Sequence, residues 1–187
     1  MKELSMFEQA LKATTTGADG LEDLGCVYNV SRQVYEEKTN FTFRAQMPCL
    51  EYLSLLVENA LLLRANRAGR VYAGFEQLSR MEAVADSYLR IADLSERLYV
   101  FGEADWKPPR HPHLRALTLA PGTGLAREYF IIADSPALHV ALVAADDDKS
   151  STSPEARVFH AIKSSCPVVV AQLAATIENL INSSLAS

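Results

Sequence analysis

Side chains that could act as nucleophiles are few in this sequence, and none stands in a catalytic pattern. No serine lies in the G-x-S-x-G pattern of a nucleophile elbow. The three cysteines, Cys26, Cys49 and Cys166, are widely spaced and fit neither a disulfide framework nor a zinc site. We interpret them as small buried hydrophobic residues or incidental surface thiols, which indicates a reducing cytoplasm.

Two groups of residues could in principle bind a metal ion. His111 and His113 have a spacing at which two imidazoles can share a metal, but no third ligand stands close to them. The prolines around them favour a rigid, irregular loop over residues 106–113. The aspartates at 146–148 lack the D-x-D-x-D-G spacing of a calcium loop, so we expect a solvated loop over 146–156. We therefore predict no bound metal and no cofactor.

Glycines that could hold a phosphate are equally sparse. Gly122 and Gly124 follow a predicted strand, but a dinucleotide-binding loop needs a third glycine and a helix that opens on it. Here residues 125–127 lead almost directly into another strand, which favours a plain turn. The sequence also has no Walker lysine, kinase signature or G-G-D/E-E-F signature of a diguanylate cyclase. We expect no enzyme activity, since no catalytic constellation remains.

Glu128 is the charged residue that packing explains least. It opens an apolar strand, where a carboxylate is costly unless it is paired or exposed. Arg80, Arg90 and Arg127 are candidate partners. Two interpretations stay open: an ion pair that fixes the edge of a sheet, or a polar contact for a ligand.

The elements that must position these residues alternate between helix and strand in the first half of the chain. Apolar spacing and capping residues predict a helix over 3–13, a strand over 26–30, a helical turn capped by Ser31, a strand over 41–46, a helix from Pro48 that ends at Gly69, a strand over 71–75, a helix over 78–93 and a strand over 98–102. The order strand, helix, strand over 70–102 predicts a parallel, right-handed crossover.

The second half is dominated by strands. We predict strands over 114–120, 128–134, 137–145 and 157–162, a tight hairpin at the Ser-Pro between the second and third of them, and a closing helix over 167–183. The expected fold class is α/β of the mixed α+β kind. A central mixed sheet carries helices on it, with one parallel βαβ crossover and a C-terminal strand meander closed by a helix.

Composition limits the partners of such a domain. The chain has 187 residues, of which 49% are hydrophobic and 22% charged, as in a single globular domain spanning 1–187. The net charge of −5 argues against nucleic acid or an anionic membrane surface as partner. The N-terminus has acidic residues within its apolar pattern, unlike a signal peptide, and no apolar run approaches the roughly 20 residues of a membrane span. We expect a cytoplasmic protein.

Several short stretches resemble the DICT domain, a sensory module of diguanylate cyclases and two-component systems. Phe75-Glu76 stands where that family has Phe-Gln or similar, and residues 87–92 (SYLRIA) stand where it has Arg-Tyr-x-x-Ile-Ala. Residues 128–132 (EYFII) match a strand that an acidic residue and an aromatic open. Ser87 replaces the family's arginine and Tyr129 its usual tryptophan. The resemblance extends over about residues 1–182.

The resemblance implies an α/β sensory domain in bacterial or archaeal signalling, predicted for the family to act in light response. The family has no well-established ligand or catalytic residue to transfer. We expect the matched aromatic residues to be buried close together, and we take Phe75, Arg80, Tyr88, Glu128 and Tyr129 as candidate ligand contacts. A ligand would then lie between the 78–93 helix and the carboxyl edges of the strands. Aromatic residues at such spacing also suit a packed core.

Three functions follow as hypotheses. The first is a non-enzymatic sensor that binds an unknown small molecule or signalling protein and acts in trans, since no effector follows Ser187. The second is an interaction or dimerisation scaffold without ligand, and the third is an enzyme of unrecognised type that uses His111, His113 or Glu128. We also expect a homodimer that uses the apolar stripes of the 3–13 and 167–183 helices.

Overall fold

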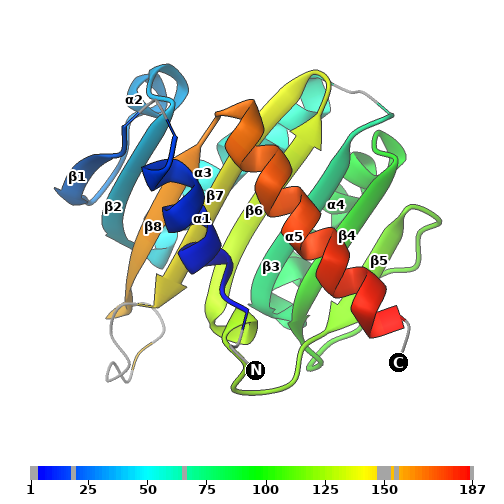
Figure 1. Ribbon diagram of the computed structural model, residues 1–187. Helices are drawn as coiled ribbons and strands as arrows, with labels where there is room; N and C mark the ends of the chain where they lie inside the picture. The colour runs from blue at the N-terminus through cyan, green and yellow to red at the C-terminus, as the bar shows by residue number, and fades with distance from the viewer. Residues whose placement is uncertain (1–3, 18–19, 65–66, 147–152, 154–155, 186–187) are drawn as a thin grey trace.

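The computed structural model describes residues 4–17, 20–64, 67–146, 153 and 156–185. Over these residues an eight-stranded mixed sheet forms the centre, with helices on both faces (Figure 1). Its strands are β1 (Glu22–Cys26), β2 (Asn40–Gln46), β3 (Arg70–Gln77), β4 (Arg97–Glu103), β5 (Leu114–Thr118), β6 (Glu128–Ser135), β7 (Leu138–Asp146) and β8 (Val158–Ser164), in the order β1-β2-β8-β7-β6-β3-β4-β5. The predicted fold class is confirmed.

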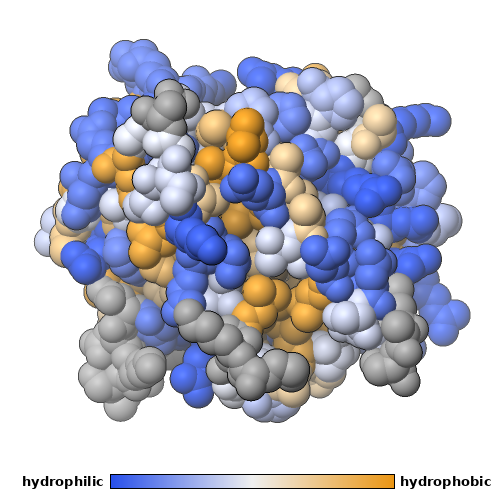
Figure 2. Space-filling view, viewed as in Figure 1, coloured by the Kyte–Doolittle hydropathy of each residue, from blue (hydrophilic) through white to orange (hydrophobic). Residues whose placement is uncertain are grey.

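Helices α1 and α5 cover one face of the sheet, and α3 and α4 lie behind it (Figure 1). The helices are α1 (Met6–Thr15), α2 (Arg32–Glu37), α3 (Met47–Leu63), α4 (Ala85–Asp93) and α5 (Pro167–Leu185), with 3-10 helices η1 (Leu78–Val84) and η2 (Leu125–Arg127). Figure 2 shows the face with α1 and α5, where apolar patches are interrupted by hydrophilic residues. Among the described helices, none combines the length and apolarity that crossing a membrane requires.

The predicted crossover is confirmed. Strands β3 and β4 pair in parallel, and η1 and α4 connect them. The first part of the connection is a 3-10 helix, where apolar spacing had predicted α-helix throughout. Its start is fixed by Asp105, whose carboxylate accepts hydrogen bonds from the backbone N–H and the hydroxyl of Ser79. That contact comes from beyond β4, so helical periodicity could not predict it.

Three boundaries and pairings differ from the sequence prediction. The first strand is β1 at 22–26 and not 26–30, because the chain leaves the sheet after Val27 and Tyr28 is fully exposed. Tyr28 and Asn29 are exposed, whereas Val30 is buried in the core without being part of a strand. Helix α3 ends at Leu63, so Gly69 does not cap it. Strand β5 pairs in parallel with β4, so the antiparallel meander is β6, β7 and β8, with the predicted tight hairpin between the first two.

Each face of the sheet has its own apolar core. One core lies between the sheet and α2, α3 and α4, and the other lies between the sheet and α1 and α5. Strand β6 serves both, because alternate residues point to opposite faces: Tyr129 and Ile131 join the first core, and Phe130 and Ile132 the second. A central strand covered on both faces is buried along nearly its whole length, as its continuous apolar run predicts.

The apolar stripe of α5 faces its own sheet. Val169, Leu173 and Ile177 are at most 3% exposed within the second core, and α1 packs beside α5. A charge at Ile177 would therefore disrupt folding before it could report on a dimer. The homodimer stays a prediction, but this stripe is occupied within one copy.

Lys163 on β8 is a buried cation at the end of the sheet where α2 lies. Its Nζ is within 2.5 Å of the Lys38 carbonyl oxygen, to which it donates, and lies 5.0 Å from the centre of the Tyr35 ring. The side chain is 2% exposed, and this burial lowers the pKa of the ammonium to about 8 from its ordinary value of 10.5. The native state therefore gains stability when this group loses its proton.

We predict that stability relative to a Lys163→Met variant rises with pH. Between pH 8 and 10 the unfolded chain binds more protons at this lysine than the folded chain, so the free energy of unfolding should rise by about 1–3 kcal/mol. The variant lacks this rise but keeps the other alkaline titrations, including Cys49. Urea unfolding at pH 7, 8, 9 and 10 checks the difference, and parallel pH profiles for the two proteins would contradict it.

Candidate functional site

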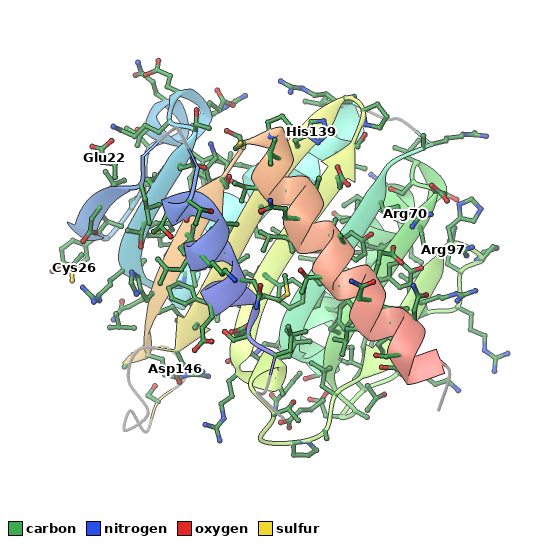
Figure 3. The ribbon with its side chains drawn as sticks, viewed as in Figure 1. Glu22, Cys26, Arg70, Arg97, His139 and Asp146 are labelled. Atoms are coloured by element: carbon green, nitrogen blue, oxygen red, sulfur yellow. The ribbon has the colours of Figure 1, made fainter. Side chains whose placement is uncertain are left out.

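A polar cleft of about 770 Å³ opens at one end of the sheet. The carboxyl ends of β3, β4 and β7 and the starts of β6 and β8 supply its walls, together with the first turn of α1. Asp146 marks this end, whereas His139 and Arg70 lie at the other end (Figure 3). The carboxyl edges of β3 and β4 lie at this end, and a ligand between them and the 78–93 helix stays a prediction.

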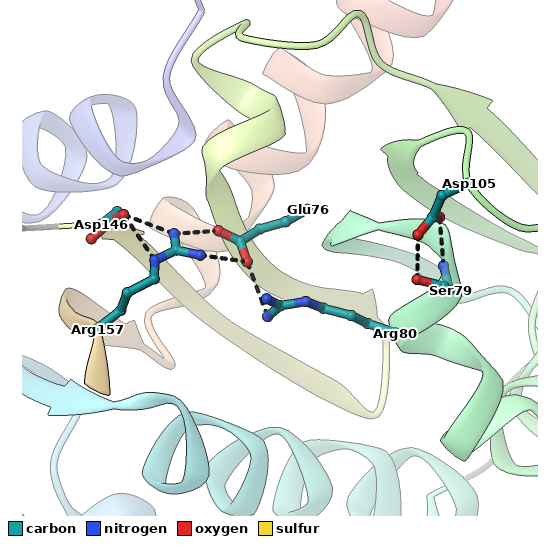
Figure 4. A network of polar contacts seen from close by, with 6 residues as sticks. All are labelled: Glu76, Ser79, Arg80, Asp105, Asp146 and Arg157. Atoms are coloured by element: carbon teal, nitrogen blue, oxygen red, sulfur yellow. Dashed lines mark hydrogen bonds and ion pairs between the residues drawn. The ribbon is translucent and has the colours of Figure 1, made fainter. Parts of the chain in front are cut away.

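A four-residue ion-pair network forms one wall of the cleft (Figure 4). Arg157 Nη2 lies 2.7 Å from Glu76 Oε1 and 2.8 Å from Asp146 Oδ2, and Arg157 Nε donates to the same Asp146 oxygen at 2.9 Å. Arg80 Nη1 approaches Glu76 Oε2 at 3.0 Å. The Glu76 carboxylate thus lies between two guanidinium groups, one from Arg80 on η1 and one from Arg157, the residue that precedes β8.

The backbone at Glu76 is strained, which singles this residue out. Its φ angle is 59°, in the left-handed region that a buried glutamate rarely adopts, and the residue is only 6% exposed. Such a conformation costs on the order of 1–3 kcal/mol and persists where surrounding contacts impose it, commonly at functional sites. The sequence motif contained Glu76, but we had not predicted it as a site residue, and no local spacing reveals its partner Arg157.

Glu128 does not make the ion pair that one of the two sequence interpretations requires, whereas a ligand contact stays a prediction. Its carboxylate accepts hydrogen bonds from Ser5 Oγ at 2.5 Å and from the backbone N–H of Met6 at 2.7 Å and Phe7 at 3.4 Å. It therefore caps the N-terminus of α1, where the helix dipole favours a negative charge. No ion pair joins Glu128 to a described arginine, and Arg80 pairs with Glu76 instead, so the expected Glu–Arg pair is wrong.

Burial and hydrogen bonding act in opposite directions on Glu128. The residue is 3% exposed, and burial raises the pKa of its carboxyl above the ordinary value. The hydrogen bonds from Ser5, Met6 and Phe7 partly offset this shift by stabilising the carboxylate. Because Glu128 and Ser5 both line the cleft, the cleft lies directly at the beginning of α1.

The matched aromatic residues lie together, as predicted. Phe75, Tyr88 and Tyr129 are at most 7% exposed, and the Phe75 ring lies 5.2 Å from the Tyr88 ring and 6.4 Å from the Tyr129 ring, centre to centre. All three belong to the core beside α3 and α4. The Phe75 ring contacts each tyrosine ring edge to face, whereas none of the three residues lines the cleft.

A buried carboxyl group that sequence reasoning missed lies beside these aromatic residues. Glu58 on α3 is 4% exposed, and Ser54 Oγ lies 3.4 Å from its Oε1. Burial raises the pKa of Glu58, and the hydroxyls of Tyr88 and Ser54 oppose that shift. The helical phase of α3 could have revealed it, because Glu58 follows the buried Ser54 by one turn.

The candidate histidines lie away from the cleft. His111 Nε2 is 2.9 Å from Asp93 Oδ1, and His113 Nδ1 is 2.9 Å from the Ser95 carbonyl oxygen. Both flank the start of β5, at the opposite end of the strand from the cleft. In the described parts of the chain, no cluster of three or more His, Cys, Asp or Glu is arranged to hold a metal ion. Most of the 147–156 loop lies outside the described residues.

Two of the five residues predicted as ligand contacts line the cleft, together with residues from distant segments of the chain. Arg80 and Glu128 line the cleft, and Phe75, Tyr88 and Tyr129 form the packed core beside it. The cleft walls offer carboxylates, guanidinium groups and a hydroxyl, which suits hydrogen bonding to a polar small molecule.

Comparison with protein families gives one match. Residues 27–147, more than half of the chain, match the family model DICT, described as the sensory domain in diguanylate cyclases and two-component systems. Comparison with curated proteins and with solved structures returned no match. The matched segment contains Phe75, Arg80, Tyr88, Glu128 and Tyr129, whereas β8, which inserts between β2 and β7, lies outside it. The chain belongs to the DICT family of sensory domains.

Proposed function

We propose that this chain is a non-enzymatic signalling sensor that binds a small polar molecule in the cleft. The single observation that carries the proposal is the strained Glu76, held by Arg80 and Arg157 in the wall of a cleft of about 770 Å³. That volume lies in the range of small-molecule sites. Membership of a family of sensory domains supports the same function.

Roles for the candidate residues follow from their positions. Arg80 would contact the ligand from η1, and Glu128 would link the cleft to α1. Phe75, Tyr88 and Tyr129 would hold the adjacent wall rigid through their ring contacts. Arginines 80 and 157 are already paired with carboxylates, so this wall suits binding more than proton transfer, and no reaction is proposed.

The partner of this sensor would be a signalling protein in the same cellular compartment. The output would be exerted in trans on a signalling protein in the cytoplasm, and a role in light response rests on the family resemblance alone. The net charge of −5 favours a small molecule or a protein over nucleic acid or membrane lipid.

A scaffold without ligand is the second candidate, and one observation favours it. The Phe75 ring packs edge to face on both Tyr88 and Tyr129 in the core, although a sensor could have used these rings to enclose a pocket. In that case the cleft network would serve only to tie the ends of β3, β7 and β8 together.

An NMR titration separates the two candidates. The ¹⁵N-labelled chain is mixed with the small-molecule fraction of an extract from the protein's own host. A sensor should show amide shifts gathered at residues that line the cleft. Ala145→Phe, which narrows the cleft without altering its charge, should abolish them, and Ala116→Phe on the exposed strand β5 should not. Shifts absent, or gathered elsewhere, would contradict the proposed site and favour a scaffold.

A further inference from the structure

Four polar side chains meet inside the core between α3, α4 and β6, and we call them the Glu58 cluster. They are Ser54 and Glu58 on α3, Tyr88 on α4 and Tyr129 on β6, and each is at most 7% exposed. Ser54 Oγ lies 3.4 Å from Glu58 Oε1, and both tyrosine hydroxyls interact with these two side chains. None of the four lines the cleft, so the cluster is separate from the proposed ligand site.

Charge compensation for the Glu58 carboxyl is lacking among the described residues. The groups that favour its ionised form are two neutral hydroxyls, one on α3 and one on α4. Glu51 and Arg80 act on the Tyr129 end of the cluster with opposite signs, and the Arg80 guanidinium is already paired with Glu76. Strands β2 and β7 also pack on α3, and the side chains that they contribute to this core are apolar: Phe41, Phe43, Ala45, Val140, Leu142 and Ala144.

These surroundings suit the neutral acid better than the carboxylate. Within the described parts of the chain, Glu58 Oε2 has no hydrogen-bond partner, so an ionised carboxylate would hold negative charge on a buried oxygen without a donor. The neutral acid carries no such charge, and it can donate to one hydroxyl oxygen while it accepts from another hydroxyl. Burial accordingly raises the pKa of Glu58 above its ordinary value of 4.5, and the hydroxyls of Tyr88 and Ser54 oppose this shift in part.

We infer that Glu58 is a proton-dependent switch in the core: α3 stays docked on α4 and β6 while the Glu58 carboxyl holds its proton, and α3 loosens when the carboxyl ionises. Glu58 is 4% exposed in the docked state, so an ionised carboxylate reaches water only if α3 moves away from the sheet. Such local opening of one element is a recognised motion of folded proteins.

The direction of the pH dependence follows from the proton that the docked state retains. Because the docked state binds more protons at Glu58 than the opened state, the docking of α3 is most stable at acid pH. This stability is lost as the pH rises from the ordinary value of 4.5 to the raised pKa of the docked carboxyl. The dependence is opposite in sign to that of Lys163, which stabilises the fold as the pH rises.

Hydrogen exchange of the whole chain, followed by mass spectrometry at several pH values from mildly acid to mildly alkaline, tests the switch. Exchange rates in α3 are compared with those of Glu58→Gln at the same pH, because glutamine has nearly the same shape and does not ionise. The ratio of wild-type to variant rates should rise about tenfold per pH unit until the carboxyl is fully ionised, and then stay constant. Glu51→Gln, at an exposed position of the same helix, is the matched control and should keep the wild-type dependence. A ratio that is the same at every pH would overturn the inference.

A measurement on the wild-type chain alone covers the case in which Glu58→Gln does not fold. Carbon-13 NMR resolves the side-chain carboxyls, and the Glu58 signal should titrate at a higher pH than the signals of the exposed glutamates. The amide signals of α3 should shift over the same pH range as the Glu58 carboxyl, because ionisation and loosening are one event. Titration of Glu58 together with the exposed glutamates, or α3 amides that do not respond to it, would show that no proton holds this helix.

Discussion

Replacing Arg157 with methionine should lower the free energy of unfolding by about 2–4 kcal/mol, since the buried Glu76 carboxylate loses the nearer of its two guanidinium partners and keeps only Arg80. Arg157 pairs with both Glu76 and Asp146, and the Glu76 side chain is only 7% exposed. Methionine keeps much of the length of the side chain, so the loss reports on the ion pairs more than on packing. Urea unfolding at neutral pH measures it.

An exposed ion pair provides the control for this variant. Arg32 pairs with Glu36 at 2.8 Å, but the two side chains are 68% and 58% exposed, so Arg32→Met should leave stability nearly unchanged. Adding Glu76→Gln to Arg157→Met should recover part of the loss, because it removes a buried negative charge that only Arg80 then offsets. If Arg157→Met costs no more than Arg32→Met, the network does not hold the cleft wall together.

Replacing Glu128 with alanine should release the N-terminal helix from the sheet. The change removes the acceptor for three hydrogen bonds and leaves the backbone N–H of Met6 buried without a partner, a loss of about 1–3 kcal/mol. Backbone amides of α1 should therefore exchange hydrogen much faster, while those of β3 and β6 keep their protection. Hydrogen exchange followed by mass spectrometry measures both.

Two further variants define the contribution of the carboxylate. Glu128→Gln keeps an oxygen acceptor but loses the charge that favours a helix N-terminus, so its effect should be intermediate. Ser5→Ala removes the hydroxyl that bonds to Glu128 and accepts from the Glu8 N–H, and should cost about 1 kcal/mol, as for other N-caps. Unchanged exchange in α1 of Glu128→Ala would show that α5 and the sheet alone hold this helix.

Local patterns in the sequence predict most of the fold. The 3.6-residue period predicts α3 and α5, and continuous apolar runs predict β3, β4 and β6, because each of these signals depends on neighbours along the chain. Local patterns do not predict strand β1, since its residues are mostly exposed and its position depends on pairing with β2.

The candidate site is less predictable, because its contacts join distant segments. Glu76 and its partner Arg157 are 81 residues apart, and Glu128 lies 122 residues from the Met6 N–H that it accepts from. No local spacing encodes such pairs. The family resemblance correctly predicted that Phe75, Tyr88 and Tyr129 lie close together. It identified no partner for Glu128, and the prediction from charge, an arginine partner, was wrong.

Native mass spectrometry of the chain purified from its own host tests the central claim most directly, namely that the polar cleft holds a small molecule. The wild-type chain should carry an added mass of a few hundred daltons, as fits a cleft of about 770 Å³. Ala145→Phe, purified in the same way, should have lost that mass, and Ala116→Phe should retain it. A wild-type chain at its bare mass, or an added mass that Ala145→Phe also retains, would contradict the account.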